Sequence, residues 1–99
     1  MNDFIQQLSE WYTANCDGEW EHQNGIVIET LDNPGWLVRI NLADTQLERI
    51  PFEKIDTQES ESRWIHCHVL NRQFVGAGDP SRLNSILSIF LAWADQNSQ

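Results

Sequence analysis

Residues 14–22, Ala-Asn-Cys-Asp-Gly-Glu-Trp-Glu-His, hold the densest group of reactive side chains in this chain of 99 residues. The stretch combines one thiol, three carboxylates and one imidazole, on Cys16, Asp17, Glu19, Glu21 and His22. Groups of these types can form a metal centre, an acid–base site or a polar surface that binds another protein. The rest of the sequence must decide among the three.

A metal centre would need further ligands, and His66 and His68 are the available candidates. They stand two residues apart in a predicted strand, so their side chains share one face and could bind zinc together with a Glu or Cys from residues 14–22. Cys67 points to the opposite face, however. The sequence also lacks the usual close Cys or His pair with a matching second pair. We therefore predict no metal ion and no cofactor.

An acid–base enzyme is the related alternative, with Glu19, Glu21 and His22 as its proton-transfer groups. The sequence contains no nucleophile elbow, phosphate-binding loop or dinucleotide fingerprint. Cys16 falls at the expected end of a helix, where the helix dipole disfavours a thiolate. We predict no catalytic residues and no enzymatic activity. A small metal-binding or acid–base domain that uses Glu19, Glu21, His22, His66 and His68 remains the alternative.

The charge of the chain restricts its partners. Six Lys and Arg stand against fifteen Asp and Glu, for a net charge of −9. Nucleic acids and anionic membranes bind basic surfaces, so we expect neither as a partner. No apolar segment is long enough to span a membrane, and no secretory signal is recognisable, so we expect a cytoplasmic protein. An acidic surface instead attracts basic partners.

The first predicted element is a helix that begins after Asp3, whose side chain can cap the exposed amide groups. Its apolar residues recur at helical spacing on one face, and Asn15 and Gly18 are the stop signals. A hairpin follows, with strands over residues 25–31 and 36–42 joined by Asp32-Asn33-Pro34-Gly35. We expect Gly35 to take a positive φ in that turn.

The second half is predicted to continue the sheet. Ile50, Phe52 and Ile55 suggest a bent, strand-like stretch with Pro51 at an edge or a strand start, and residues 56–62 are predicted to be a loop. Residues 63–70 form a strand, and a short strand around Phe74 and Val75 is broken by residues 76–78. Asp79 then caps a second helix with Pro80 at its first position.

These elements predict a single domain over residues 1–99 of the α+β class. We expect an antiparallel sheet of four to five strands flanked by an N-terminal and a C-terminal helix, in the order α-β-β-β-β-(β)-α. Both helices should cover the same face of the sheet, which leaves the other face partly exposed to water.

A protein-binding surface is the remaining interpretation of the reactive stretch. Tryptophan often anchors such surfaces, and carboxylates around it can meet a basic partner. Trp36 and Trp93 fall on apolar stripes and are expected in the core, whereas Trp20 and Trp64 suit core and surface equally. The predicted partner-binding residues are Asp17, Glu19, Trp20, Glu21, His22, Asp32 and Trp64.

Residues 11–36, W-Y-T-A-N-C-D-G-E-W-E-H-Q-N-G-I-V-I-E-T-L-D-N-P-G-W, resemble the immunity protein 53 family of bacterial polymorphic toxin systems. The segments F-V-G-A-G-D-P-S-R-L (residues 74–83) and F-L-A-W-A (residues 90–94) are similar to the C-terminal half of that family. The resemblance implies a small cytosolic antitoxin that binds a cognate toxin domain. Toxins of such systems are often nucleases with basic grooves, which would suit an acidic inhibitor. An adaptor unrelated to toxins is a further alternative.

Overall fold

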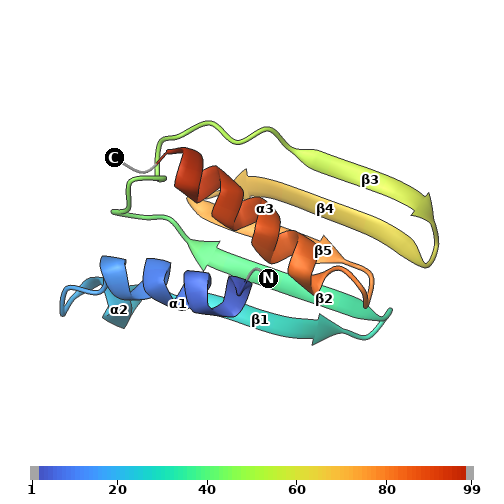
Figure 1. The fold of residues 1–99 in the computed structure, drawn as a ribbon, viewed down its shortest axis with the longest axis horizontal. Helices are drawn as coiled ribbons and strands as arrows, with labels where there is room; N and C mark the ends of the chain where they lie inside the picture. The colour runs from blue at the N-terminus through green and yellow to red at the C-terminus, as the bar shows by residue number, and fades with distance from the viewer. Residues whose placement is uncertain (1–2, 98–99) are drawn as a thin grey trace.

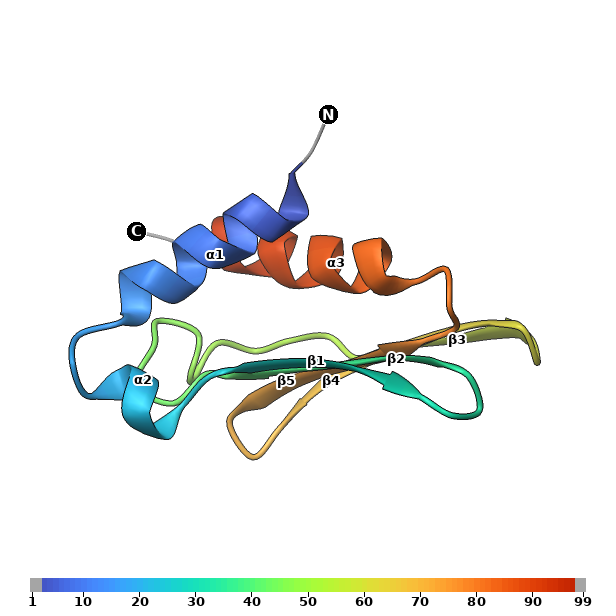
Figure 2. The same cartoon turned by 90° about the horizontal axis from the view of Figure 1, so that it is seen from below.

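The computed structural model describes residues 3–97, which form three helices and five strands. The elements in chain order are α1 (Phe4–Asn15), α2 (Trp20–Gln23), β1 (Ile26–Leu31), β2 (Gly35–Asn41), β3 (Ile55–Ser60), β4 (Arg63–Leu70), β5 (Gln73–Gly78) and α3 (Leu83–Gln96). The strands make one antiparallel sheet in the order β1-β2-β5-β4-β3 (Figure 1). Helices α1 and α3 lie on the same face of that sheet (Figure 2). The predicted α+β class and element order are confirmed.

Helix α1 begins as its sequence predicts. The Asp3 side chain accepts a hydrogen bond from the backbone N–H of Gln6 at 2.9 Å, which satisfies one of the amide groups that a helix start leaves unpaired. Leu8 is buried on the face that meets the core. Ile5 is 57% exposed, because it lies at the margin of the apolar stripe and not at its centre. None of the described helices is long and apolar enough to cross a membrane.

The hydrophobic core fills the space between the sheet and the two long helices. Strand β2 contributes Val38 and Ile40, strand β5 contributes Phe74, and α3 contributes Ile86 and Phe90; all five are fully buried. Along β2, the buried Val38 and Ile40 alternate with less buried residues, which is the predicted period-two pattern of a strand with one buried face. Among residues 3–97, no helix packs across the other face of the sheet (Figure 2).

Strand β3 occupies residues that the sequence predicts to be a loop. It pairs with β4 in the register Asp56↔His66 and Thr57↔Ile65, with an irregularity between Gln58 and Ser60. Five of its six residues are exposed, because it is an edge strand with no helix over its outer half. An edge strand of this kind shows no apolar alternation, so its composition looks like that of a loop.

The stretch around Ile50 and Phe52, which is predicted to be strand-like, is irregular. Both residues nevertheless pack against the core. The Phe52 ring stands edge-on to Phe74 and to Trp93, with centroids 5.5 Å and 5.1 Å away. The Trp93 indole donates a hydrogen bond to the carbonyl oxygen of Pro51 at 3.1 Å, which fixes this coil beside α3. Aromatic packing takes the place of strand pairing here.

The glycines of residues 76–78 continue strand β5 and do not break it. β5 lies at the centre of the sheet, between β2 and β4. A Cβ on Gly76 would overlap the Cγ2 methyl of Ile86, and a Cβ on Gly78 would overlap the Arg82 side chain. The missing side chains therefore allow the chain at and just before α3 to lie close against the central strand.

Gly35 and Asp79 also differ from their predicted roles. Gly35 has no positive φ, and among the described glycines only Gly18 does, at 94°. Gly35 is instead required for space, because a Cβ there would overlap the carbonyl oxygen of Gly78. Helix α3 begins at Leu83 with Arg82 at the N-cap position, so Asp79 and Pro80 form a turn that precedes the helix.

Replacing Gly76 with Ala should destabilise the folded chain by about 1–3 kcal/mol, because the new methyl group meets the buried Ile86 side chain in a packed core. Urea unfolding measures the change. Gly25→Ala is the matched control, since nothing lies within 4 Å of its Cβ position. Equal unfolding midpoints for Gly76→Ala and the wild type would contradict the close approach of α3 to β5.

Candidate functional site

The structure divides the predicted partner-binding residues between the two ends of the sheet. Asp17, Glu19, Trp20, Glu21 and His22 lie in and before α2, at one end of β1. Asp32 lies in the turn at the other end of β1, and Trp64 lies at the start of β4 (Figure 1). A six-residue strand is roughly 20 Å long. The structure therefore does not bring Asp32 together with Glu19 and Glu21.

Two of the carboxylates before and in α2 have internal roles. Asp17 accepts hydrogen bonds from the backbone N–H groups of Glu19 and Trp20, both at 2.9 Å. Glu21 accepts from the backbone N–H groups of Asp17 at 3.0 Å and Gly18 at 2.8 Å. The N–H of Trp20 and then that of Glu19 lower the pKa of Asp17. The pKa of Glu21 is lowered by its own backbone N–H and by those of Asp17 and Gly18. Both side chains thus stabilise the bend between α1 and α2.

Trp20 belongs to the core. The sequence had left open whether this side chain lies in the core or on the surface. Its side chain is only 5% exposed, and its indole N–H donates to the carbonyl oxygen of Ala43 at 2.7 Å. The Trp11 and Tyr12 rings of α1 stand against it, with centroids 6.1 Å and 6.0 Å away. Trp20 therefore fastens α2 to α1 and to the end of β2, and its ring does not form an exposed anchor.

The acidic corner is the surface formed by Asp17, Glu19, Glu21 and Asp44. Asp17, Glu19 and Asp44 line a shallow hollow of about 120 Å³. Among residues 3–97, no cation pairs with the carboxylate of Glu19 or of Asp44. Asp44 was not predicted, because it comes from the loop after β2 and only the fold brings it beside α2. Its φ of 63° and the hydrogen bond from its N–H to Glu48 fix that loop.

The negative charge of the chain is concentrated in its first part. Residues 1–38 contain seven Asp and Glu and no Lys or Arg, whereas residues 39–99 contain eight Asp and Glu with all six Lys and Arg. Several of those cations pair locally, for example Arg63 with Glu59 at 3.9 Å and Arg82 with Asp79 at 3.0 Å. Glu29 of β1 pairs with Arg39 at 3.4 Å, so the uncompensated charge lies on α1, on α2 with the bend before it, and on the turn after β1.

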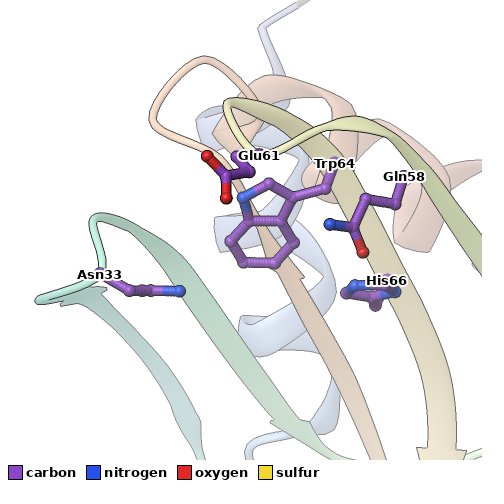
Figure 3. A pocket seen from close by; sticks show the side chains of 5 residues that line it. All are labelled: Asn33, Gln58, Glu61, Trp64 and His66. Atoms are coloured by element: carbon purple, nitrogen blue, oxygen red, sulfur yellow. The ribbon is translucent and has the colours of Figure 1, made fainter.

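The Trp64 notch is a hollow of about 500 Å³ on the open face of the sheet. Figure 3 shows its five lining side chains, Asn33, Gln58, Glu61, Trp64 and His66. The Trp64 ring stands among the others, with Glu61 on one side and Gln58 and His66 on another, while the Asn33 amide points toward it from the β1–β2 turn (Figure 3). Of these five, the sequence singled out Trp64 for the partner surface and His66 for the alternative site.

Asp79 holds Trp64 in place through the backbone. Its Oδ2 accepts a hydrogen bond from the Trp64 N–H at 2.8 Å, and its own N–H donates to the Trp64 carbonyl at 3.1 Å. The same carboxylate accepts from the N–H and hydroxyl of Ser81 and from Nε of Arg82. The Ser81 hydroxyl makes the largest contribution in lowering the pKa of Asp79 well below its ordinary value. A nearly fully buried carboxylate is thereby kept charged and satisfied.

The histidines do not assemble into a metal centre. His66 and His68 share the open face as predicted, and the His66 Nδ1 lies 2.6 Å from Oδ1 of Asp56. His22 lies in α2, near the opposite end of the molecule from the start of β4 (Figure 1). Within residues 3–97, no three or more His, Cys, Asp and Glu side chains are arranged to hold a metal ion. The structure does not support the metal-binding alternative.

The model of the family described as Immunity protein 53 matches residues 5–95, which is most of the chain. No curated protein and no solved structure matches the chain.

Replacing Asp79 with Asn should lower the urea midpoint at neutral pH, because the amide nitrogen of Asn cannot accept from the N–H of Trp64 or from Arg82. The pKa of Asp79 is lower in the folded than in the unfolded chain, so its carboxylate stabilises the fold at pH values above its ordinary value of 3.8. That stabilisation is lost as the pH falls below this value. The difference in urea midpoint between the wild type and Asp79→Asn should therefore become smaller at acidic pH.

Unfolding curves at several pH values test this expectation, with Asp32→Asn as the control because Asp32 is exposed in a turn. If the urea midpoint of Asp79→Asn differs from that of the wild type by the same amount at every pH, the carboxylate charge does not have the stabilising role given to it.

Proposed function

The chain belongs to the immunity protein 53 family, and from this premise we propose that it is an antitoxin that binds and neutralises a cognate toxin domain of a bacterial polymorphic toxin system. The family match over residues 5–95 carries this proposal. The antitoxin acts in the cytoplasm and needs no cofactor, because occupation of the toxin surface is sufficient to block the toxin.

We propose further that the toxin has a basic active-site groove, of the kind that nucleases use to bind phosphates. The net charge of −9 supports this view, and so does the concentration of that charge in residues 1–38. An acidic inhibitor can stand in for a phosphate backbone in such a groove, and it gains the long-range attraction that nucleic acid would otherwise have. The enzyme would then be blocked by exclusion of its substrate.

Charge of this kind acts mainly on the rate of association. Oppositely charged proteins are steered toward each other before they touch, and salt screens the effect over about 10 Å at 0.1 M. Within the acidic corner, Glu19 is well suited to steering because no described residue pairs with it. Asp17 and Glu21 are less suitable, since their carboxylates already bind backbone N–H groups in the bend before α2.

The antitoxin role is tested with the polypeptide encoded by the gene beside this one. Cells that produce that polypeptide should survive when the chain described here is produced with it, and the two should co-purify as a complex. Unchanged toxicity together with no complex would refute the proposal. A polypeptide without toxicity, if it binds, would point instead to an adaptor unrelated to toxins.

Replacing Glu19 with Lys should reduce the association rate with that polypeptide by about two- to fivefold at low salt, because the variant removes a steering charge and adds a repelling one. The dissociation rate should change little, and the difference should vanish at about 0.5 M salt because exposed charges are then screened. Surface plasmon resonance measures both rates.

Glu53→Lys is the matched control, since Glu53 is also exposed and lies in the coil beside α3, away from the acidic corner. If both variants associate at the wild-type rate at low salt, the acidic corner does not steer the partner. A loss confined to Glu53→Lys would place the steering surface beside α3.

A further inference from the structure

We propose that the Trp64 notch is the anchoring site of the complex and that it receives one arginine side chain of the toxin. This inference rests on the proposed function, because it assigns the surface through which the antitoxin holds its partner. It separates two tasks, with steering assigned to the acidic corner at one end of β1 and anchoring assigned to the notch at the other.

The Trp64 side chain is available for a partner in a way that the indoles of Trp20, Trp36 and Trp93 are not. Trp20, Trp36 and Trp93 each donate the indole N–H to a backbone carbonyl of this chain, at 2.7 Å, 3.0 Å and 3.1 Å. No residue among 3–97 accepts a hydrogen bond from the Trp64 indole. Trp11 also has no indole acceptor among residues 3–97, but its ring packs edge-on against Trp20 and Phe90 at the core. Trp64 is also only partly buried and lines the hollow. Its indole N–H therefore keeps its capacity to donate, and part of its ring is exposed.

The polar groups of the notch favour a cation. Glu61 supplies a carboxylate beside the Trp64 ring, and Gln58 supplies a side-chain carbonyl oxygen, whereas Asn33 points its amide nitrogen toward the notch (Figure 3). His66 is turned toward Asp56, with 2.6 Å between Nδ1 and Oδ1. Acceptors around an aromatic face form a site for a positively charged group that can also lie on the ring.

The charges around the notch are not neutralised by this chain. The nearest arginines are occupied, because Arg63 pairs with Glu59, and Arg82 pairs with both Glu59 and Asp79. No cation among residues 3–97 pairs with Glu61. Asp32 precedes Asn33 in the same turn and adds a further exposed carboxylate. An incoming cation would therefore meet an open negative site.

Arginine fits this site better than lysine. The guanidinium group is planar, so it can lie flat on the indole while its N–H fork reaches the Glu61 carboxylate and the amide oxygen of Gln58. The ammonium group of lysine has no plane to stack and is more strongly hydrated. A backbone carbonyl of the toxin beside that arginine can accept a hydrogen bond from the indole N–H of Trp64.

The notch is also held ready before the partner arrives. Asp79 fixes both the N–H and the carbonyl of Trp64. Gly35 leaves room for the ring, since a Cβ there would come within 3.3 Å of Trp64 Cζ2. The His66 ring lies 5.3 Å from the Trp64 ring on the neighbouring position of the same face. A ring fixed in this way loses little conformational entropy on binding, which is typical of residues that dominate an interface.

The experiment compares dissociation rates of the complex with the polypeptide encoded by the neighbouring gene. Glu61→Gln should accelerate dissociation about tenfold, because it removes a charge-assisted hydrogen bond at the centre of the contact. Trp64→Phe should have a similar effect through the weaker ring face and the lost N–H donor. Glu53→Gln is the matched control for loss of one exposed carboxylate, and its dissociation rate should equal that of the wild type.

The arginine is identified by replacing each arginine of the partner polypeptide with lysine. One such change should accelerate dissociation by as much as Glu61→Gln, and combining the two should add little, since the same contact is lost twice. Thermal unfolding of each variant confirms that it is folded, and Glu61→Gln changes an exposed turn residue.

The outcomes separate the two proposals. Wild-type dissociation rates for both Glu61→Gln and Trp64→Phe, in a complex that forms and protects, overturn the notch and leave the antitoxin role intact. The notch proposal is also overturned if Glu61→Gln and Trp64→Phe weaken the complex but their effects add fully to that of every Arg→Lys change in the partner. No complex with the wild-type chain overturns both proposals together.

Discussion

The carboxylate of Asp79 ties strand β4 to the turn that leads from β5 into α3. It accepts hydrogen bonds from Trp64 in β4, from Ser81 in the turn and from Arg82 at the start of α3, while its own backbone follows the last residue of β5. A buried carboxylate without these donors would strongly destabilise the fold, so the donors and the charge are required together. The position of α3 over the glycines of β5, and the position of Trp64 on the opposite face, both depend on this junction.

The junction at Asp79 lies where the two faces of the sheet differ, since one face is covered by the core and the other is open. The face toward α1 and α3 is closed by Phe74, Ile86 and Phe90, which are fully buried. The other face stays open, and its side chains in β4 are Trp64, His66 and His68. Because residues alternate between faces along β4, the strand that buries Ile65 and Cys67 also presents the residues of the notch. Burial raises the pKa of the Cys67 thiol to about 11, so this cysteine serves packing.

Much of the fold could be predicted from the sequence where an element buries one regular face. The alternation of Trp36, Val38 and Ile40 with other residues predicts β2. The apolar stripe through Ile86 and Phe90 predicts α3. Prediction failed where tertiary contacts determine the structure. Strand β3 is an exposed edge that exists because β4 pairs with it, and Gly76 and Gly78 lie within a strand because α3 leaves no room for side chains. For the candidate site, the sequence singled out Trp64, but Asn33 reaches it only through the strand order, and Glu61 reaches it because residues predicted to be a loop form a hairpin with β4.

The position of β5 in the sheet has a consequence for the making of the protein. Asn33 belongs to the hairpin of β1 and β2, whereas Gln58, Glu61, Trp64 and His66 belong to β3, β4 and the turn between them. Those two pairs of strands can form early from neighbouring residues, but in the sheet they are joined only by β5, the last strand in the chain. A chain emerging from the ribosome therefore has no complete notch until residues 73–78 have been added and paired on both sides. Under the proposed anchoring role of the notch, synthesis of almost the whole polypeptide precedes binding of the toxin.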